Sequence, residues 1–113
     1  MIVEPPPLGR GSTHVRGTCT SVPSVVTVVG EALIDIIVDP AGNVTSVVGG
    51  APLNTARTIA RLGVPATFLG GVSTDAFGAR IMRLLQADGV GYALGEQVDE
   101  PTTLAIAQID ADG

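Results

Sequence analysis

The chain has 113 residues, enough for one small domain, and 45% of them are hydrophobic, so the sequence predicts a buried core. Six Arg, no Lys and eleven acidic residues give a net charge of −5, which argues against a nucleic-acid or anionic-membrane partner. No apolar run is long enough to cross a bilayer and the start is unlike a secretory signal, so we expect a cytoplasmic protein.

Residues 1–24 are predicted to form an irregular leader, either native or the product of a mis-assigned translation start. Three prolines at 5–7 precede several glycines among Ser and Thr, and apolar residues show no periodicity there. The single cysteine, Cys19, and the single histidine, His14, both lie in this leader. The sequence therefore offers neither an internal disulfide nor a Cys/His cluster with the spacing of metal ligands.

The part of the chain predicted to be ordered begins with two extended segments, and the second contains an isolated carboxylate. Residues 25–29 are a β-branched run typical of a strand buried on both faces, and residues 32–38 continue in an extended conformation. Asp35 lies among six apolar neighbours in the second segment. Because burying an unpaired carboxylate is costly, Asp35 is expected to face a partner or a polar cavity, or else to lie at a strand end in water.

Residues 39–43 have the composition of a turn, and residues 44–48 are predicted to return as the partner strand of a hairpin. The returning strand leads directly to Gly49 and Gly50. This route can bring Asp35 near Asn54, although nineteen residues separate them in the sequence.

The stretch 49–63 predicts a tight turn followed by a helix. Pro52 favours the first helical turn because its φ is fixed and its missing N–H is not needed there. One stripe of the helix is apolar, formed by Leu53, Ala56, Ile59 and Ala60. Gly63 suits the left-handed position that ends many helices.

The start of this helix has residues suited to binding a small polar ligand. Gly49 and Gly50 have no Cβ, so the backbone can bend tightly and approach a ligand closely. Asn54 carries a donor and an acceptor beside the unpaired N–H groups of the first turn. An ordinary turn that feeds a helix is the alternative for this stretch taken alone.

The remaining segments predict a second helix between further strands. Residues 66–72 are predicted to form a buried strand, Asp75 is predicted to cap the second helix, and Gly89 to end it. The apolar face of that helix is formed by Phe77, Ile81, Leu84 and Leu85. Alternation of strands and helices predicts right-handed βαβ units in an open α/β sheet. Residues 90–96 are predicted as a short strand and residues 102–109 as a clearer one.

Asp112 and Gly113 form a hairpin-turn signal that no returning strand follows. A parallel sheet of this size also lacks neighbours for its edges. We therefore expect these residues to be the front part of a longer protein.

With these segments identified, residues 25–113 resemble the N-terminal part of a PfkB (ribokinase-like) carbohydrate kinase, closest to fructokinase-like members. The resemblance depends on four segments in family-like order and spacing: residues 28–35, 49–63, 71–78 with 87–90, and 101–105. It implies an α/β fold, a ribokinase-like open sheet with helices on both faces plus a small β lid. Only an incomplete N-terminal portion of that fold would be present, with lid strands at about 36–48 and 102–109.

The resemblance also implies which residues bind a sugar. In the family, the Asp of the first motif and the Gly-Gly and Asn of the second bind sugar hydroxyls, and these roles map to Asp35, Gly49, Gly50 and Asn54. A carboxylate that accepts from two hydroxyls agrees with this assignment. Ala105 is expected to line the lid side of the pocket, with simple packing as its alternative role.

The motifs that carry catalysis in the family are missing from this chain. No Gly-Ala-Gly-Asp segment with the catalytic Asp occurs, and no Asn-x-x-Glu segment of the kind linked to Mg²⁺. The resemblance therefore implies that the catalytic residue lies beyond Gly113, and that ATP and Mg²⁺ bind only in the full-length protein. We expect the 113 residues alone to be inactive.

Two hypotheses follow. The first is the sugar-binding N-terminal portion of an ATP-dependent, fructokinase-like carbohydrate kinase, which transfers the γ-phosphoryl group of ATP to a sugar hydroxyl. The second is a truncated or degenerate, non-catalytic member that acts as a sugar-binding module or dimerises through its lid strands. A dinucleotide-binding domain is excluded because no G-x-G-x-x-G motif follows Gly30. Fructose is the favoured sugar, and ketodeoxygluconate, ribose, adenosine and sugar phosphates stay open.

Overall fold

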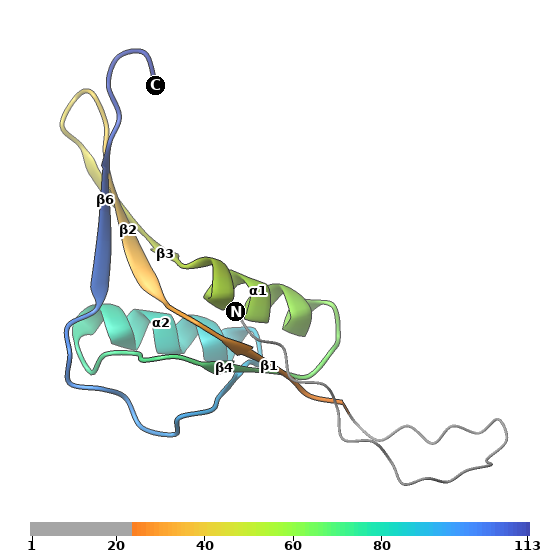
Figure 1. Cartoon of the computed structure of the whole chain (residues 1–113). Helices are drawn as coiled ribbons and strands as arrows, with labels where there is room; N and C mark the ends of the chain where they lie inside the picture. Colours follow the sequence, from red (N-terminus) through yellow and green to blue (C-terminus); the bar gives the residue numbers. More distant parts are fainter. Residues whose placement is uncertain (1–23) are drawn as a thin grey trace, which may run out of the picture.

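The computed structural model describes residues 24–113, which form two small sheets and two helices (Figure 1). The leader predicted at residues 1–24, with His14 and Cys19, lies outside the described residues except for Ser24. Neither of the two helices in the described part is long and apolar enough to cross a membrane.

The first sheet is parallel and has the strand order β1-β4-β5. Its strands are β1 (Val26–Val29), β4 (Ala66–Leu69) and β5 (Gly91–Tyr92). Helix α1 (Ala51–Arg61) leads into β4, and α2 (Ala76–Ala87) connects β4 to β5. The predicted βαβ units are therefore confirmed.

Both connections advance across the sheet in the same direction, so right-handed crossovers place both helices on one face. Figure 1 shows α1 and α2 on the same side of β1 and β4. On the opposite face the hydroxyls of Thr27 and Thr67 form a hydrogen bond of 2.9 Å between β1 and β4. The α/β class is confirmed, and the helical layer expected on that second face is not part of residues 24–113.

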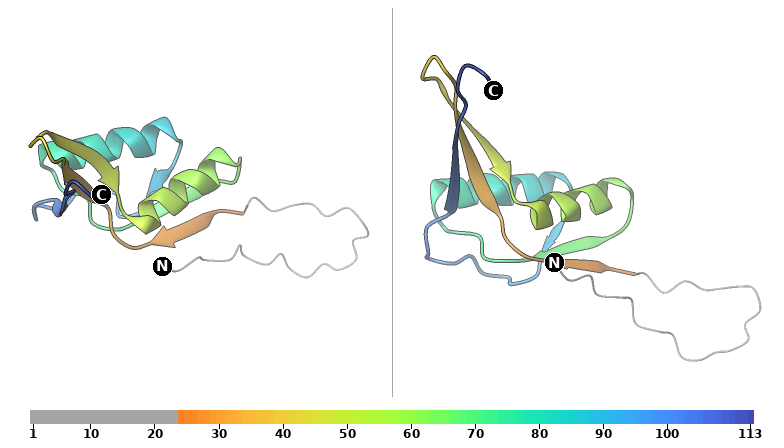
Figure 2. Two further views of the ribbon diagram at one scale, coloured as in Figure 1. Left: turned by 90° about the horizontal axis from the view of Figure 1, so that it is seen from above. Right: turned by 45° about the horizontal axis from the view of Figure 1, so that its top comes forward.

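The second sheet has the order β3-β2-β6 and is formed by β2 (Leu33–Val38), β3 (Val44–Gly49) and β6 (Thr103–Gln108). The predicted hairpin is present, because β2 and β3 pair in the antiparallel direction, whereas β2 and β6 are parallel. In the hairpin turn the Asp39 carboxylate accepts hydrogen bonds from the N–H groups of Ala41 and Asn43. This Asx turn fixes the register of the two strands. The second sheet extends away from the helices (Figure 2).

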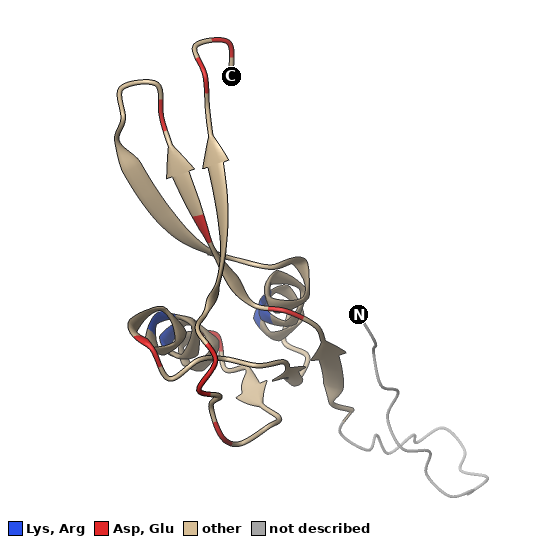
Figure 3. Cartoon of the chain, turned by 60° about the vertical axis from the view of Figure 1, so that its left-hand side comes forward, with Lys and Arg blue, Asp and Glu red and all other residues tan. Residues whose placement is uncertain are grey.

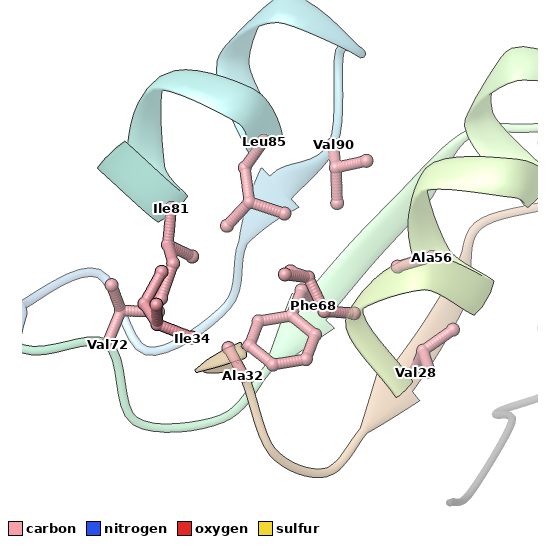
Figure 4. Packing of buried hydrophobic residues seen from close by; sticks show 10 residues of the cluster. Val28, Ala32, Ile34, Ala56, Phe68, Val72, Ile81, Leu85 and Val90 are labelled. Carbon is pink, nitrogen blue, oxygen red and sulfur yellow. The ribbon is translucent and has the colours of Figure 1, made fainter. Parts of the chain in front are cut away.

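One hydrophobic core joins the two sheets and both helices (Figure 4). Phe68 of β4 is its largest fully buried side chain, and Ile34 of β2 is buried in the same cluster. The other members come from β1, from both helices and from the loops between elements: Val28, Ala32, Leu53, Ala56, Val72, Ile81, Leu85 and Val90. The lower end of the second sheet is therefore packed into the core of the first.

Both helices begin and end where local sequence signals place them. Pro52 lies in the first turn of α1, and Gly63 follows its end with φ +91°. Asp75 caps α2, since its carboxylate accepts from the N–H of Gly78 at 2.7 Å, and Gly89 follows with φ +72°. The strands agree less well with the prediction: β4 ends at Leu69, and beyond it the N–H of Val72 donates to the Tyr92 hydroxyl at 3.1 Å. The strand predicted at 90–96 is reduced to β5.

The first turns of α2 hold both edge strands of the second sheet. Arg80 donates two hydrogen bonds of 2.7 Å to Ser46 on β3, one to its hydroxyl and one to its carbonyl oxygen. Asp75 accepts from the hydroxyl of Thr102 at 2.6 Å and from its N–H at 2.8 Å, immediately before β6. These hydrogen bonds, first those from Thr102 and then that from Gly78, lower the pKa of Asp75 to about 2.

The Asp75 contacts predict a loss of stability in acid. Because the folded-state pKa of about 2 lies below the ordinary value of 3.8, ionised Asp75 stabilises the fold fully above about pH 4. That contribution disappears as the pH falls through about 2. We expect Asp75→Asn to lower the thermal midpoint of the full-length protein at neutral pH, and the difference from wild type to shrink between pH 4 and 2. A difference that stays constant over this range would contradict the prediction, and Asp99→Asn is the control.

Candidate functional site

The candidate site lies where β1 and β4 end and α1 begins. In open α/β sheets, ligands bind beyond the carboxyl ends of the parallel strands. Here the N–H of Gly30, after β1, donates to the carbonyl of Leu69 at 3.1 Å. A Cβ on Gly30 would overlap the ring of Pro52, and a Cβ on Gly70 would overlap the carbonyl oxygen of Gly30. The glycines therefore let both strand ends and the first turn of α1 come together.

Asp35 and Gly49 are in direct contact at this point. Asp35 lies on β2, paired with Val47 on β3 and with Ala105 on β6. Since paired residues and alternate residues share a face, Asp35, Gly49 and Ala105 lie on the same face of the second sheet. A Cβ on Gly49 would overlap the Asp35 carboxylate oxygen. The carboxylate therefore occupies the space that any other residue at position 49 would fill.

Gly50 makes the turn from β3 into α1. Its φ of +106° is a conformation that other residues rarely adopt, and a Cβ there would lie 2.6 Å from the carbonyl oxygen of Glu31. As the N-cap residue it has no side chain that could accept from the first N–H groups of α1. The carbonyl of Gly50 accepts from the N–H of Asn54 at 3.0 Å, which closes the first helical turn.

Asn54 is exposed on that first turn, and its side-chain oxygen accepts from Arg57 Nη1 at 3.4 Å. It borders a shallow depression on α1 lined by Ala51, Asn54, Thr55, Thr58 and Ile59. Both threonine hydroxyls donate to helix carbonyls at 2.8 Å, so the Asn54 amide is the polar side-chain group of this depression that keeps free donors.

The structure thus places the predicted residues as one connected series. Asp35 lies against Gly49, Gly50 follows Gly49, and Gly50 bonds to Asn54 through the backbone. Ala105 is half-buried beside Asp35, and its small side chain leaves that flank of the carboxylate open.

One feature of this region was missed by the sequence analysis. All four Arg of the described residues lie on the two helices, as Figure 3 shows, and two of them converge on Asp88. Arg57 Nε lies 2.5 Å and Arg61 Nε 3.0 Å from the Asp88 carboxylate, which follows α2. The hydrogen bond from Arg57, followed by that from Arg61, lowers the pKa of Asp88. The spacing of the two arginines along α1 was visible in the sequence, but their partner after the end of α2 was not.

No group of three or more His, Cys, Asp or Glu side chains in residues 24–113 is placed to hold a metal ion. Asp75 instead caps α2, Asp39 closes the hairpin turn and Asp88 pairs with two arginines, whereas Asp35 lies against Gly49.

The chain was compared with known proteins. The model of the pfkB family of carbohydrate kinases matches residues 24–113. The chain is similar to a fructokinase of Escherichia coli, with 43% identity over 65 residues that cover 58% of this chain and 21% of that protein. It is similar to fructokinase-2 of Oryza sativa subsp. japonica, with 34% identity over 108 residues that cover 89% of this chain and 31% of that protein.

Among solved structures, the chain resembles a fructokinase with bound ATP from Xylella fastidiosa. The TM-score is 0.69 at 29% identity, over 75% of this chain and 29% of that one. The chain spans 21% to 31% of the length of these three proteins. The structural similarity confirms the predicted α/β, ribokinase-like fold for that portion. The chain therefore belongs to the pfkB family of carbohydrate kinases, as a fructokinase-like portion of the family's fold.

Proposed function

We propose that this chain is the sugar-binding part of an ATP-dependent carbohydrate kinase of the fructokinase type. The observation that carries the proposal is the Asp35 carboxylate lying against Gly49, directly before the glycine turn into α1. It occurs in a chain whose residues 24–113 match the kinase family throughout.

The chemistry of the site supports a polyhydroxylated ligand. An ionised carboxylate accepts hydrogen bonds only, and its two oxygens suit two neighbouring hydroxyls of a sugar. Gly49 leaves room for the Asp35 carboxylate and Gly50 makes the turn into α1, so the acceptor lies next to the helix start, where the Asn54 amide adds donors. Ala105 bounds the pocket on the side of the second sheet.

Phosphoryl transfer requires groups that we place outside this chain. The Xylella fastidiosa fructokinase binds ATP, and we propose that the full-length protein binds ATP with Mg²⁺ through residues beyond Gly113. A metal ion would neutralise charge on the transferring phosphoryl group, and a further carboxylate would take the proton of the sugar hydroxyl. Residues 24–113 hold and orient the sugar, and none of them is proposed as the general base.

The second sheet is proposed to act as the lid of this site. One of its faces carries Asp35, Gly49 and Ala105, so the sheet contributes directly to the pocket. Its lower end is fixed to the core by Ile34 and to α2 by the hydrogen bonds of Arg80 and Asp75. The outer end of the sheet extends beyond the helices and would cover a bound sugar (Figure 2).

A second copy of the chain is proposed as the partner of the other face of this sheet. Three apolar side chains, Val44, Leu104 and Ile106, share that face by strand register and are exposed. Burial of such a cluster stabilises an interface. This feature also supports the alternative function, a non-catalytic member that binds sugar or dimerises through its lid strands.

The sugar site is tested by kinase assays and calorimetric binding on the full-length protein, with fructose, ribose and adenosine as substrates. We expect Asp35→Ala to weaken sugar affinity by about 10- to 150-fold, since a charged hydrogen bond contributes about 1.5–3 kcal/mol. Gly49→Ala should also weaken sugar affinity, because the added Cβ would displace the Asp35 carboxylate. Gly71→Ala is the matched control, because a Cβ there meets Val98 at an ordinary 3.5 Å.

Affinity within about twofold of wild type for both Asp35→Ala and Gly49→Ala, with the fold intact, would refute the sugar site. The 113 residues alone should show no ATP turnover above a no-protein control. Turnover by them would contradict the placement of catalysis outside this chain.

The dimer is tested by sedimentation of the full-length protein. Ile106→Asp places a charge at a side chain that is 72% exposed, and it should convert dimer to monomer. Leu62→Asp is the control, since Leu62 is 77% exposed but lies beyond α1, away from the second sheet. A monomeric wild type, or equal effects of both changes, would disprove the interface.

A further inference from the structure

Arg57 makes contacts that the sugar site as described does not require. Its side chain is only 17% exposed, and its Nε donates to the Asp88 carboxylate at 2.5 Å. Its Nη1 donates to the side-chain oxygen of Asn54 at 3.4 Å. Among the hydrogen bonds of residues 24–113, this guanidinium alone connects Asp88 to a residue of the candidate site.

The Asp88 end of this connection is rigid. Asp88 is 11% exposed, and its N–H bonds to the carbonyl of Leu84 at 3.1 Å as the cap of α2. Its second carboxylate oxygen is bound by Arg61 at 3.0 Å. A guanidinium is planar, so the bond at Nε fixes the direction in which its Nη1 donor points.

The orientation of Arg57 determines the orientation of the Asn54 amide. The terminal torsion of an asparagine side chain is broad, so an unrestrained amide can turn either its oxygen or its NH₂ group to a ligand. Because the oxygen is turned to Arg57, the NH₂ group points away from Arg57 and is the end offered to the ligand. The site would then combine an acceptor, Asp35, with a fixed donor, Asn54.

We propose that Arg57 is a positioning residue for the sugar: held by Asp88, it fixes the Asn54 carboxamide so that the NH₂ group donates to a sugar oxygen. The inference rests on the proposed function, and it deepens that function by assigning the polarity of the site. One sugar hydroxyl donates a hydrogen bond to Asp35, and another sugar oxygen accepts one from Asn54.

If Arg57 only joined the two helices, it would affect stability but not sugar binding. Arg61 also binds Asp88 from α1, but the bond to Asn54 belongs to Arg57. The two arginines therefore form a matched pair: both contribute to stability through Asp88, and one of them acts on the site.

The test compares Arg57→Met with Arg61→Met in the full-length protein, because Met keeps most of the apolar stem of the side chain. Both changes should lower the thermal midpoint. Arg57→Met should raise the sugar KM and the calorimetric sugar Kd by about 3- to 10-fold, with the ATP KM unchanged, since a freed amide must be reordered on binding. Arg61→Met should change sugar affinity much less, because Arg57 keeps its own oxygen of the Asp88 carboxylate. Equal changes in the two variants, or no change in Arg57→Met, would overturn the proposal.

A double-mutant cycle gives the sharper result. Asn54→Ala should weaken sugar binding, and Arg57→Met should add nothing further in the Asn54→Ala background. The same fold-change in both backgrounds would show that Arg57 acts on something other than Asn54, and would refute the inference.

The same variants distinguish a wrong role for Arg57 from a wrong sugar site. If Asp35→Ala and Asn54→Ala weaken sugar binding while Arg57→Met does not, only the role of Arg57 is wrong. If none of the three changes affects sugar binding, the sugar site itself is wrong, and the inference fails with it.

Discussion

The position of the Asp35 carboxylate, and with it the candidate site, depends on the absence of a Cβ at position 49. Gly49 leaves the space in which the Asp35 carboxylate lies, on a strand whose neighbouring Ile34 is fully buried. A carboxylate on the core face would carry a large desolvation cost, but alternation along β2 turns Asp35 to the opposite face. Gly50, at φ +106°, then directs the chain into α1. The acidic group and the helix start are therefore joined by two consecutive glycines, which is why a polar site can form beside an aliphatic core.

The second sheet is fixed in place by contacts at its edges as well as by burial. Ile34 packs into the shared core, while Arg80 bonds to Ser46 on one edge strand and Asp75 to Thr102 at the start of the other. All of these anchors lie near the start of α2 or the base of the sheet. The outer part of the sheet is left with exposed apolar side chains, which fits a lid that meets a ligand on one face and a protein partner on the other.

Local signals in the sequence predicted the helices well. Pro52, Gly63, Asp75 and Gly89 act through backbone geometry or capping within a few residues, so they can be recognised without knowing the fold. The hairpin was predicted from its short turn, whereas the contact of Asp35 with Gly49 was not predicted and depends on the register of β2 and β3. The hydrogen bond between Val72 and Tyr92 and the Arg57–Asp88 ion pair could not be predicted, because each joins residues that are far apart in the sequence. The parallel pairing of β6 with β2 also joins distant parts of the sequence. Only the family resemblance assigned their segments to one lid.

In the proposed site, Asp35 and the start of α1 bind the same sugar from two sides. A crystal structure of the full-length protein with fructose tests it most directly. The account predicts sugar oxygens within hydrogen-bond distance, about 2.7–3.2 Å, of both the Asp35 carboxylate and the Asn54 NH₂ group. A sugar bound elsewhere, or one that contacts neither side chain, would contradict it.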